Sequence, residues 1–156
     1  GLHTMTGGRI KRVEKYLHDE PFMLTYGDGV SDVNLQELLS FHKKKGKVAT
    51  ITMVNLTQQK GVLDVDKEGI IHSFREKEEK DGAVLNGGFM VLEPEIFRYL
   101  QDDQTILEQS TMQALASEGK LAGYYHPGFW QCMDTQREKK LLEELWASGK
   151  APWKRW

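Results

Sequence analysis

An aspartate between two glycines, directly after a short apolar run, constrains the fold of this chain most. Residues 22–24 are apolar and have the length of a buried strand, and Pro21 excludes a helix that continues from upstream. Gly27 and Gly29 let the backbone turn sharply and approach a ligand closely, so Asp28 brings a carboxylate to the end of the strand. In open α/β sheets this edge is where ligands bind. The alternative is a Gly-Asp-Gly turn without chemistry, and the rest of the chain has to decide between the two.

The composition predicts one globular domain and argues against several classes of function. The chain has 156 residues, 39% of them hydrophobic and 28% charged, and this length suffices to bury roughly two-thirds of the unfolded surface. Its 21 basic and 23 acidic residues are spread along the sequence, so no face for nucleic acid or membrane is expected. Cys132 is the only cysteine, which excludes an intramolecular disulfide and favours a reducing compartment. With neither a membrane-spanning apolar run nor a signal-peptide pattern, we expect a cytoplasmic protein.

A strand, a helix and a second strand form the first predicted unit. Asn34 stands three residues before Glu37, which is the spacing of an N-cap with a reciprocal partner, and Gly46 occupies the position of a C-terminal cap. Residues 48–54 are rich in β-branched side chains and predict a strand. We therefore expect the strand at residues 22–24 and the strand at residues 48–54 to form a parallel pair with a right-handed crossover.

Two further helix starts are predicted from capping patterns. Thr105 and Glu108 repeat the capping-box spacing ahead of a helix that runs to Gly119, and Asp134 is a plausible N-cap for the last helix. The other expected elements are an amphipathic helix over residues 10–17, a hairpin over residues 62–65 and 70–74, a strand over residues 89–92, a strand over residues 121–125 and a helix over residues 135–149. The glycine pair in residues 6–9 is either a backbone loop that cradles a base or a phosphate, or the lead-in to the first helix.

Asp28 and Asp134 each follow a predicted strand, and they meet only if the two strands lie close together. Two hard oxygen ligands suit Mg²⁺, which typically takes one or two carboxylates plus substrate phosphates. The five histidines have no paired metal-ligand spacing and Cys132 stands alone, so zinc is disfavoured. No glycine-flanked serine supports a Ser-His-Asp hydrolase. Phosphate chemistry is the best remaining enzyme class, and the alternative is that Asp134 only caps a helix.

Six stretches of the sequence match one known family in the order in which that family has them. They are residues 5–9, 25–32, 74–77, 85–89, 126–135 and 151–154. On these stretches the whole chain resembles the sugar-phosphate nucleotidyltransferases. The resemblance implies an α/β, Rossmann-like nucleotide-diphospho-sugar transferase fold, with a mixed sheet flanked by helices that lacks the first strands. It also implies Mg²⁺-dependent transfer of a cytidylyl group from CTP to glucose 1-phosphate, which gives CDP-glucose and pyrophosphate.

The resemblance also implies roles for individual residues. By motif match, Asp28 and Asp134 look like the two Mg²⁺ ligands, and Lys77 is similar to the lysine that neutralises the sugar phosphate. These three residues are the implied catalytic group, while Asp32 is a weaker candidate in the same acidic loop. Glu76 resembles the acid that binds sugar hydroxyls. The implied substrate-binding residues, with residues 6–9 on the nucleotide side and 86–88 on the sugar side, are Thr6, Gly7, Gly8, Arg9, Tyr26, Gly27, Glu76, Asn86, Gly87, Gly88 and Trp130.

The sequence departs from the family pattern at two places. Glu78 stands where the family usually has proline after its glutamate-lysine pair, which adds negative charge beside Lys77. The family's first strand and its glycine-rich loop have no counterpart before Gly1, so we interpret residues 1–156 as the C-terminal part of a single nucleotidyltransferase domain. A sheet without its first strands exposes edges and apolar surface, so we expect association, and the family favours a homo-oligomer. Two other functions stay open: a non-catalytic sugar-phosphate-binding or assembly module, and a glycosyltransferase that uses a nucleotide-sugar.

Overall fold

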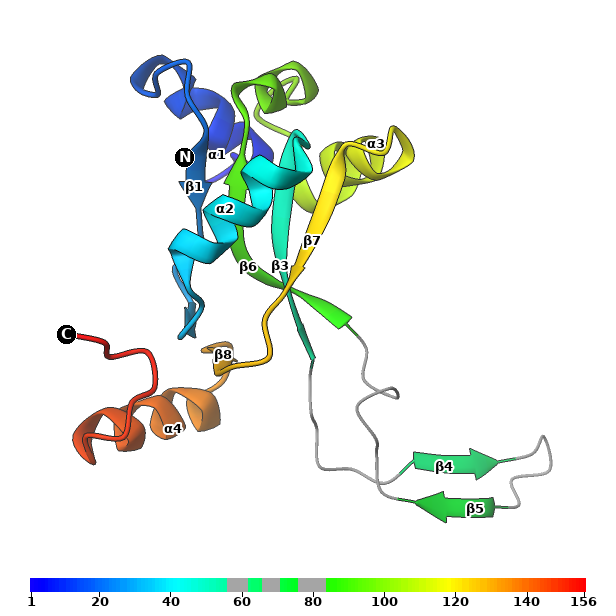
Figure 1. The fold of residues 1–156 in the computed structure, drawn as a ribbon, viewed down its shortest axis with the longest axis vertical. Coiled ribbons are helices and arrows are strands. Elements are labelled where there is room, and N and C mark those ends of the chain that lie inside the picture. Colours follow the sequence, from blue (N-terminus) through cyan, green and yellow to red (C-terminus); the bar gives the residue numbers. More distant parts are fainter. Residues whose placement is uncertain (56–61, 66–70, 76–83) are drawn as a thin grey trace.

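A four-stranded mixed sheet with helices on both faces forms the centre of the computed structural model, which describes residues 1–55, 62–65, 71–75 and 84–156 (Figure 1). The strand order is β1 (Phe22–Leu24), β6 (Val84–Leu92), β3 (Ala49–Asn55) and β7 (Leu121–Tyr125). β6 runs antiparallel to both of its neighbours, whereas β3 and β7 are parallel. The α/β class and the mixed sheet flanked by helices are therefore confirmed.

The expected direct pairing of the strand at residues 22–24 with the strand at residues 48–54 is wrong, because β6 lies between them. Leu92 of β6 is the register partner of Phe22 on one side and of Ala49 on the other. β6 takes this central position because its C-terminal half, which includes Met90 and Val91, is apolar and buried from both faces. Since β6 is antiparallel to both neighbours, β1 and β3 still point in the same direction.

One face of the sheet carries the larger core. Ala49, Met90 and Leu92 pack there with Ile96 and Leu107, all of them buried. The elements that cover this face are α1 (Thr6–Val13), which the 3-10 helix η1 (Glu14–Tyr16) follows, the 3-10 helix η3 (Pro94–Tyr99), the π-helix η4 (Leu107–Thr111) and α3 (Met112–Ser117). Together they fix the position of the segments before β1 and after η3.

The helix α2 (Leu35–Lys45) crosses the opposite face, as Figure 1 shows, and it begins and ends where the sequence predicts. The Asn34 side chain accepts hydrogen bonds from the backbone N–H groups of Gln36 and Glu37, and Gly46 adopts a left-handed conformation with φ 57°. His42 anchors the helix because it is fully buried and both ring nitrogens are bonded, to Thr50 Oγ1 at 2.8 Å and to Glu93 at 3.0 Å.

Two smaller sheets and a last helix complete the described part of the chain. β4 (Val62–Val65) and β5 (Ile71–Arg75) form the predicted antiparallel hairpin, whose turn lies outside the described residues. β2 (Gly29–Ser31) pairs antiparallel with β8 (Trp130–Cys132), and α4 (Gln136–Ala147) follows β8. In none of the described helices do length and hydropathy suffice to cross a membrane.

Two of the predicted helix caps are wrong. Thr105 accepts hydrogen bonds from the backbone of Gln101 and Asp102 and caps no helix. At the last helix the cap is Thr135, whose side chain accepts from the Glu138 N–H while the Glu138 side chain accepts from the Thr135 N–H. The N-cap of the observed capping box is Thr135, one residue after Asp134, so the Asp134 carboxylate does not cap the helix.

Candidate active site

The two aspartates singled out in the sequence lie at paired strand ends. β2 and β8 are antiparallel, with Gly29 opposite Cys132, so Asp28, directly before β2, and Asp134, two residues after the end of β8, lie at the same end of this strand pair. The Met133 N–H donates to the Asp28 carbonyl oxygen at 2.8 Å, which extends the pairing by one residue beyond the strands. Both carboxylates are exposed. The structure thus places Asp28 and Asp134 at one end of the β2–β8 pair, while their role as metal ligands stays a prediction.

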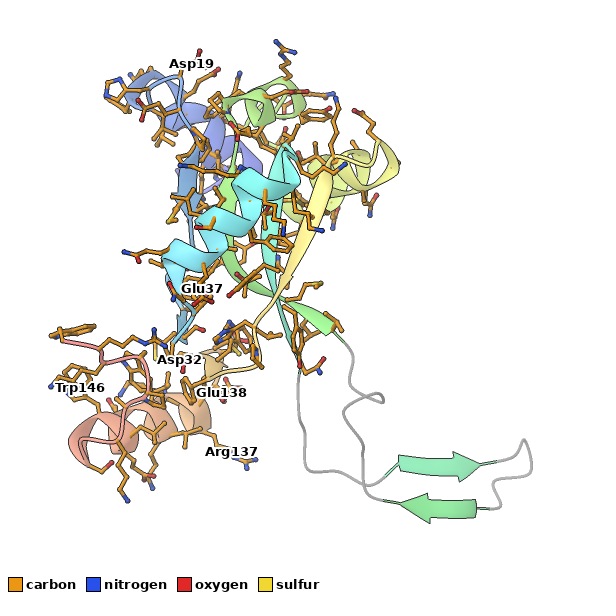
Figure 2. All side chains as sticks on the ribbon, viewed as in Figure 1. Asp19, Asp32, Glu37, Arg137, Glu138 and Trp146 are labelled. Atoms are coloured by element: carbon orange, nitrogen blue, oxygen red, sulfur yellow. The ribbon has the colours of Figure 1, made fainter. Side chains whose placement is uncertain are left out.

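The donor groups around Asp134 fit a hard cation better than a soft one. Ligand atoms of Cys132, Asp134 and Glu138 lie within 4.8 Å of one another, and Figure 2 shows Glu138 at the end of α4 nearer to β8. Burial, followed by a hydrogen bond to Asp134, raises the pKa of the Cys132 thiol to about 11, so the thiol stays protonated at neutral pH. Glu138 is already engaged by the backbone N–H groups of Asp134 and Thr135. In this cluster the Asp134 carboxylate is an oxygen donor of the kind that Mg²⁺ prefers, and Asp28 lies outside the cluster.

Asp32, the weaker candidate, is occupied by contacts within the chain. Its Oδ1 lies 2.9 Å from Nε2 of the buried His126, and its Oδ2 lies 3.8 Å from the Arg155 guanidinium. These contacts join the end of β2 to the loop after β7 and to the C-terminal residues. We therefore interpret Asp32 as a residue that holds three segments together beside the site.

The glycine pair near the N-terminus lies inside a helix. Gly7 and Gly8 are buried in the first turn of α1, which begins at Thr6, before the expected start at residue 10. A Cβ atom at Gly8 would lie 2.6 Å from the backbone of Asp103, so the helix packs tightly on that segment. The lead-in to a helix is thus the correct alternative and the cradling loop is wrong. Thr6 and Arg9 remain exposed, although the Arg9 Nε–H donates to the Thr4 carbonyl at 2.9 Å.

The residues expected on the sugar side contact one another. The register between β3 and β6 shifts between Asn86 and Met90 of β6, and such bulges often re-aim side chains beside functional sites. The Trp130 indole N–H donates to the Gly87 carbonyl at 2.7 Å, and Asn86 accepts from the Gly88 N–H at 2.9 Å. Gly88 has φ 81° and faces the ring of Tyr26. The predicted wall is therefore a connected group at the same end of the molecule as Asp28.

A carboxylate that the sequence analysis assigned to a helix cap joins two of the predicted segments. Glu108 accepts a hydrogen bond from the Thr6 hydroxyl at 2.7 Å and another from the Tyr26 hydroxyl. Burial of the phenol, followed by this bond to Glu108, raises the pKa of Tyr26 well above its usual range, and Asn86 opposes the rise. Sequence reasoning missed Glu108 because its partners are 102 and 82 residues away, so no local pattern marks it.

Two of the predicted site residues cannot be placed. Glu76 and Lys77, together with Glu78, follow β5 and lie outside the described residues. Their predicted contacts with a sugar phosphate therefore stay predictions.

A comparison with known protein families assigns this α/β fold to a class of proteins. Residues 6–145 match the family described as nucleotidyl transferase. The chain belongs to the nucleotidyl transferase family.

Two curated proteins are similar in sequence to most or all of this chain. The glucose-1-phosphate cytidylyltransferase of Salmonella typhimurium is 48% identical over 157 residues, which cover 100% of this chain and 61% of the relative. The mannose-1-phosphate guanyltransferase of Aspergillus fumigatus is 33% identical over 144 residues, covering 88% of this chain and 39% of that protein. The chain thus spans about 61% of the length of the Salmonella relative.

A solved structure supports the fold. The crystal structure of HddC from Yersinia pseudotuberculosis superimposes with a TM-score of 0.68 and 19% identity, covering 92% of this chain and 63% of that one. At this identity the likeness concerns the fold alone.

Proposed function

We propose that this chain takes part in the Mg²⁺-dependent transfer of a cytidylyl group from CTP to glucose 1-phosphate, which gives CDP-glucose and pyrophosphate. The observation that carries the proposal is the pairing of β2 with β8, because it brings Asp28 and Asp134 to one end of the molecule. The 48% identity to the Salmonella cytidylyltransferase supports the choice of this reaction within the family.

The chemistry needs neutralisation of charge more than it needs a base. The attacking oxygen belongs to a phosphate whose second pKa is about 6, so it is mostly dianionic near neutral pH and requires no general base. The difficulty is to bring one anion up to the α-phosphate of another, which calls for positioning and compensating charge. Asp28 and Asp134 would hold Mg²⁺, which when bound supplies that compensating charge. We propose that Lys77 offsets the remaining charge of the sugar phosphate.

The wall beside Asp28 is suited to holding a sugar in one orientation. The indole of Trp130 is fixed by the Gly87 carbonyl, and the ring of Tyr26 packs against Gly88. Asn86 is exposed at the edge of this wall, and its amide oxygen is held by the Gly88 N–H. We propose that these residues orient glucose 1-phosphate, with Glu76 binding sugar hydroxyls.

We also propose that the protein forms a homo-oligomer. Among the described strands, β1 pairs only with β6, so its other edge is open. Three large apolar side chains on the surface support this proposal, since Met23, Leu141 and Trp146 are 44%, 43% and 50% exposed. Sedimentation equilibrium should give a mass of at least two chains, and a monomer at micromolar concentration would contradict the proposal.

The experiment that tests the reaction is a calorimetric titration of the 156-residue chain with CDP-glucose in Mg²⁺, repeated with UDP-glucose. We expect CDP-glucose to bind more tightly, and Asp134→Asn to abolish binding without changing the unfolding midpoint. Asp19→Asn is the matched control, because Asp19 is also exposed but lies at the far end of the molecule (Figure 2). Equal binding by wild-type and Asp134→Asn chains would contradict the metal-ligand assignment.

Activity assays separate the proposed reaction from its alternatives. Release of pyrophosphate on mixing CTP and glucose 1-phosphate identifies nucleotidyl transfer, and Asp134→Asn should remove it. Binding of CDP-glucose without any turnover would favour a non-catalytic module. Consumption of CDP-glucose in the presence of a sugar acceptor would instead identify a glycosyltransferase.

A further inference from the structure

We infer that Glu108 is a positioning residue, which holds the start of α1 and the turn that carries Asp28 at a fixed separation. This inference rests on the proposed function, in which α1 borders the nucleotide and Asp28 the metal. Glu108 itself touches neither reacting group in this assignment. It acts through the Thr6 and Tyr26 hydroxyls.

The geometry of the carboxylate is that of a bridge. Oε2 accepts from the hydroxyl of Thr6, the first residue of α1, and Oε1 accepts from the hydroxyl of Tyr26, two residues before Asp28. The Leu107 N–H donates to Thr6 Oγ1 at 3.0 Å, so the Thr6 hydroxyl is held from both sides. Hydrogen bonds to an ionised acceptor are stronger than neutral ones, and two of them on one carboxylate restrict both segments.

The backbone that carries Glu108 is anchored in the core. Glu108 lies in η4, whose first residue Leu107 is fully buried and whose last residue Thr111 is 1% exposed. The Thr111 hydroxyl also donates to the Tyr99 carbonyl at 3.2 Å. Single π-turns occur frequently at functional sites. The exposed Glu108 carboxylate thus extends from a backbone segment whose two end residues are buried.

The Tyr26 side chain connects Glu108 to Gly88. Its ring lies so close to Gly88 that an added Cβ there would be 2.6 Å from the Tyr26 Cδ2 atom. The ring is thus fixed by Gly88 and the hydroxyl by Glu108. Loss of the hydroxyl bond would free the backbone between β1 and β2, where Asp28 lies.

The same segment offers a matched control at its other end. Glu118, directly after α3, accepts from the Tyr99 hydroxyl at 2.6 Å and pairs with Lys120 at 3.1 Å. This tyrosine-glutamate pair has the chemistry of the Tyr26–Glu108 pair, but it lies away from Asp28 and Asp134. Replacement of Glu118 by alanine removes a comparable bond without touching the proposed site.

The test compares Glu108→Ala, Glu108→Gln and Glu118→Ala with the wild-type chain. The first readout is hydrogen exchange at residues 6–9 and 26–29, which should accelerate together in Glu108→Ala only.

The second readout is the affinity for CDP-glucose in Mg²⁺. We expect Glu108→Ala to weaken binding about tenfold, Glu108→Gln to recover most of it because the amide keeps the shape and one acceptor, and Glu118→Ala to leave it unchanged. Tight binding by Glu108→Ala, or unchanged exchange at residues 6–9 and 26–29, would overturn the positioning role. If the wild-type chain binds no CDP-glucose, the proposed function fails for this chain, while the exchange data still decide the role of Glu108.

Discussion

A Cβ atom added at Gly8 would lie 2.6 Å from the Cα and carbonyl oxygen of Asp103, whereas a Cβ atom added at Gly27 would meet no atom of the described residues within 4 Å. Both glycines belong to stretches that the family resemblance assigns to substrate binding. The packing of the chain accounts for Gly8, because α1 cannot approach residues 103–105 with a larger side chain. The packing of the described residues does not account for Gly27, and we expect the requirement for glycine there to come from a bound ligand.

The packing of the chain accounts for Gly88 as it does for Gly8. Its φ of 81° is a conformation that other residues adopt only at a cost, and the ring of Tyr26 occupies the space of a side chain. A glycine-rich motif therefore combines two requirements that its sequence does not distinguish. One is close packing within the fold and the other is room for a ligand, and substitutions separate them.

Gly8→Ala should have the largest effect on stability. The added methyl group would clash with backbone atoms of Asp103, which cannot rotate away, so we expect an overpacking cost at the upper end of the usual range, about 3 kcal/mol or more. The better helix propensity of alanine returns about 1 kcal/mol, so we expect a net loss of about 2 kcal/mol or more. Urea unfolding measures it. A midpoint equal to that of the wild-type chain would mean that α1 does not pack on residues 103–105 in solution.

Gly88→Ala should destabilise the chain less but should disturb the site more. A left-handed conformation costs a residue with a side chain about 1–2 kcal/mol, and the Tyr26 ring has to move by a few tenths of an ångström or more. We therefore expect a loss of about 2 kcal/mol in urea unfolding. The pKa of Tyr26 should also fall, because a displaced phenol loses Glu108. An unchanged Tyr26 titration would show that the ring does not rest on Gly88.

Local patterns predicted those parts of the fold that depend on neighbouring residues. The caps of α2 are bonds between Asn34, Gly46 and backbone groups a few positions away, so their spacing in the sequence was sufficient. The capping box of α4 was also present in the sequence, as Thr135 and Glu138, but Asp134 is an equally good capping residue and was chosen instead. Helix boundaries of this kind are ambiguous by one residue whenever two capping residues are adjacent.

Long-range arrangement could not be predicted in the same way. The insertion of β6 between β1 and β3 depends on pairings between residues from 29 positions apart, for Asn55 and Val84, to 70 positions apart, for Phe22 and Leu92, and no local pattern encodes them. For the site, the sequence places Asp28 and Asp134 after predicted strands and the family resemblance implies their role, while the register of β2 against β8 explains why both lie at one end of this strand pair. Glu108 was missed because its two partners come from the far end of the sequence, and only the folded chain brings them together.

Gly27→Ala should have the smallest effect on stability and is the sharpest test of the comparison. Gly27 has no positive φ and no neighbour among the described residues in the space of a Cβ atom, so the unfolding free energy should change by no more than about 0.5 kcal/mol. If a ligand lies against this turn, the same methyl group should weaken CDP-glucose binding in Mg²⁺, as calorimetry can measure. The control is Asp19→Asn, an exposed change at the far end of the molecule that should leave binding unchanged (Figure 2). Unchanged binding in Gly27→Ala would mean that the ligand does not lie against this turn. Neither the packing of the described residues nor the binding site would then explain the glycine at this position.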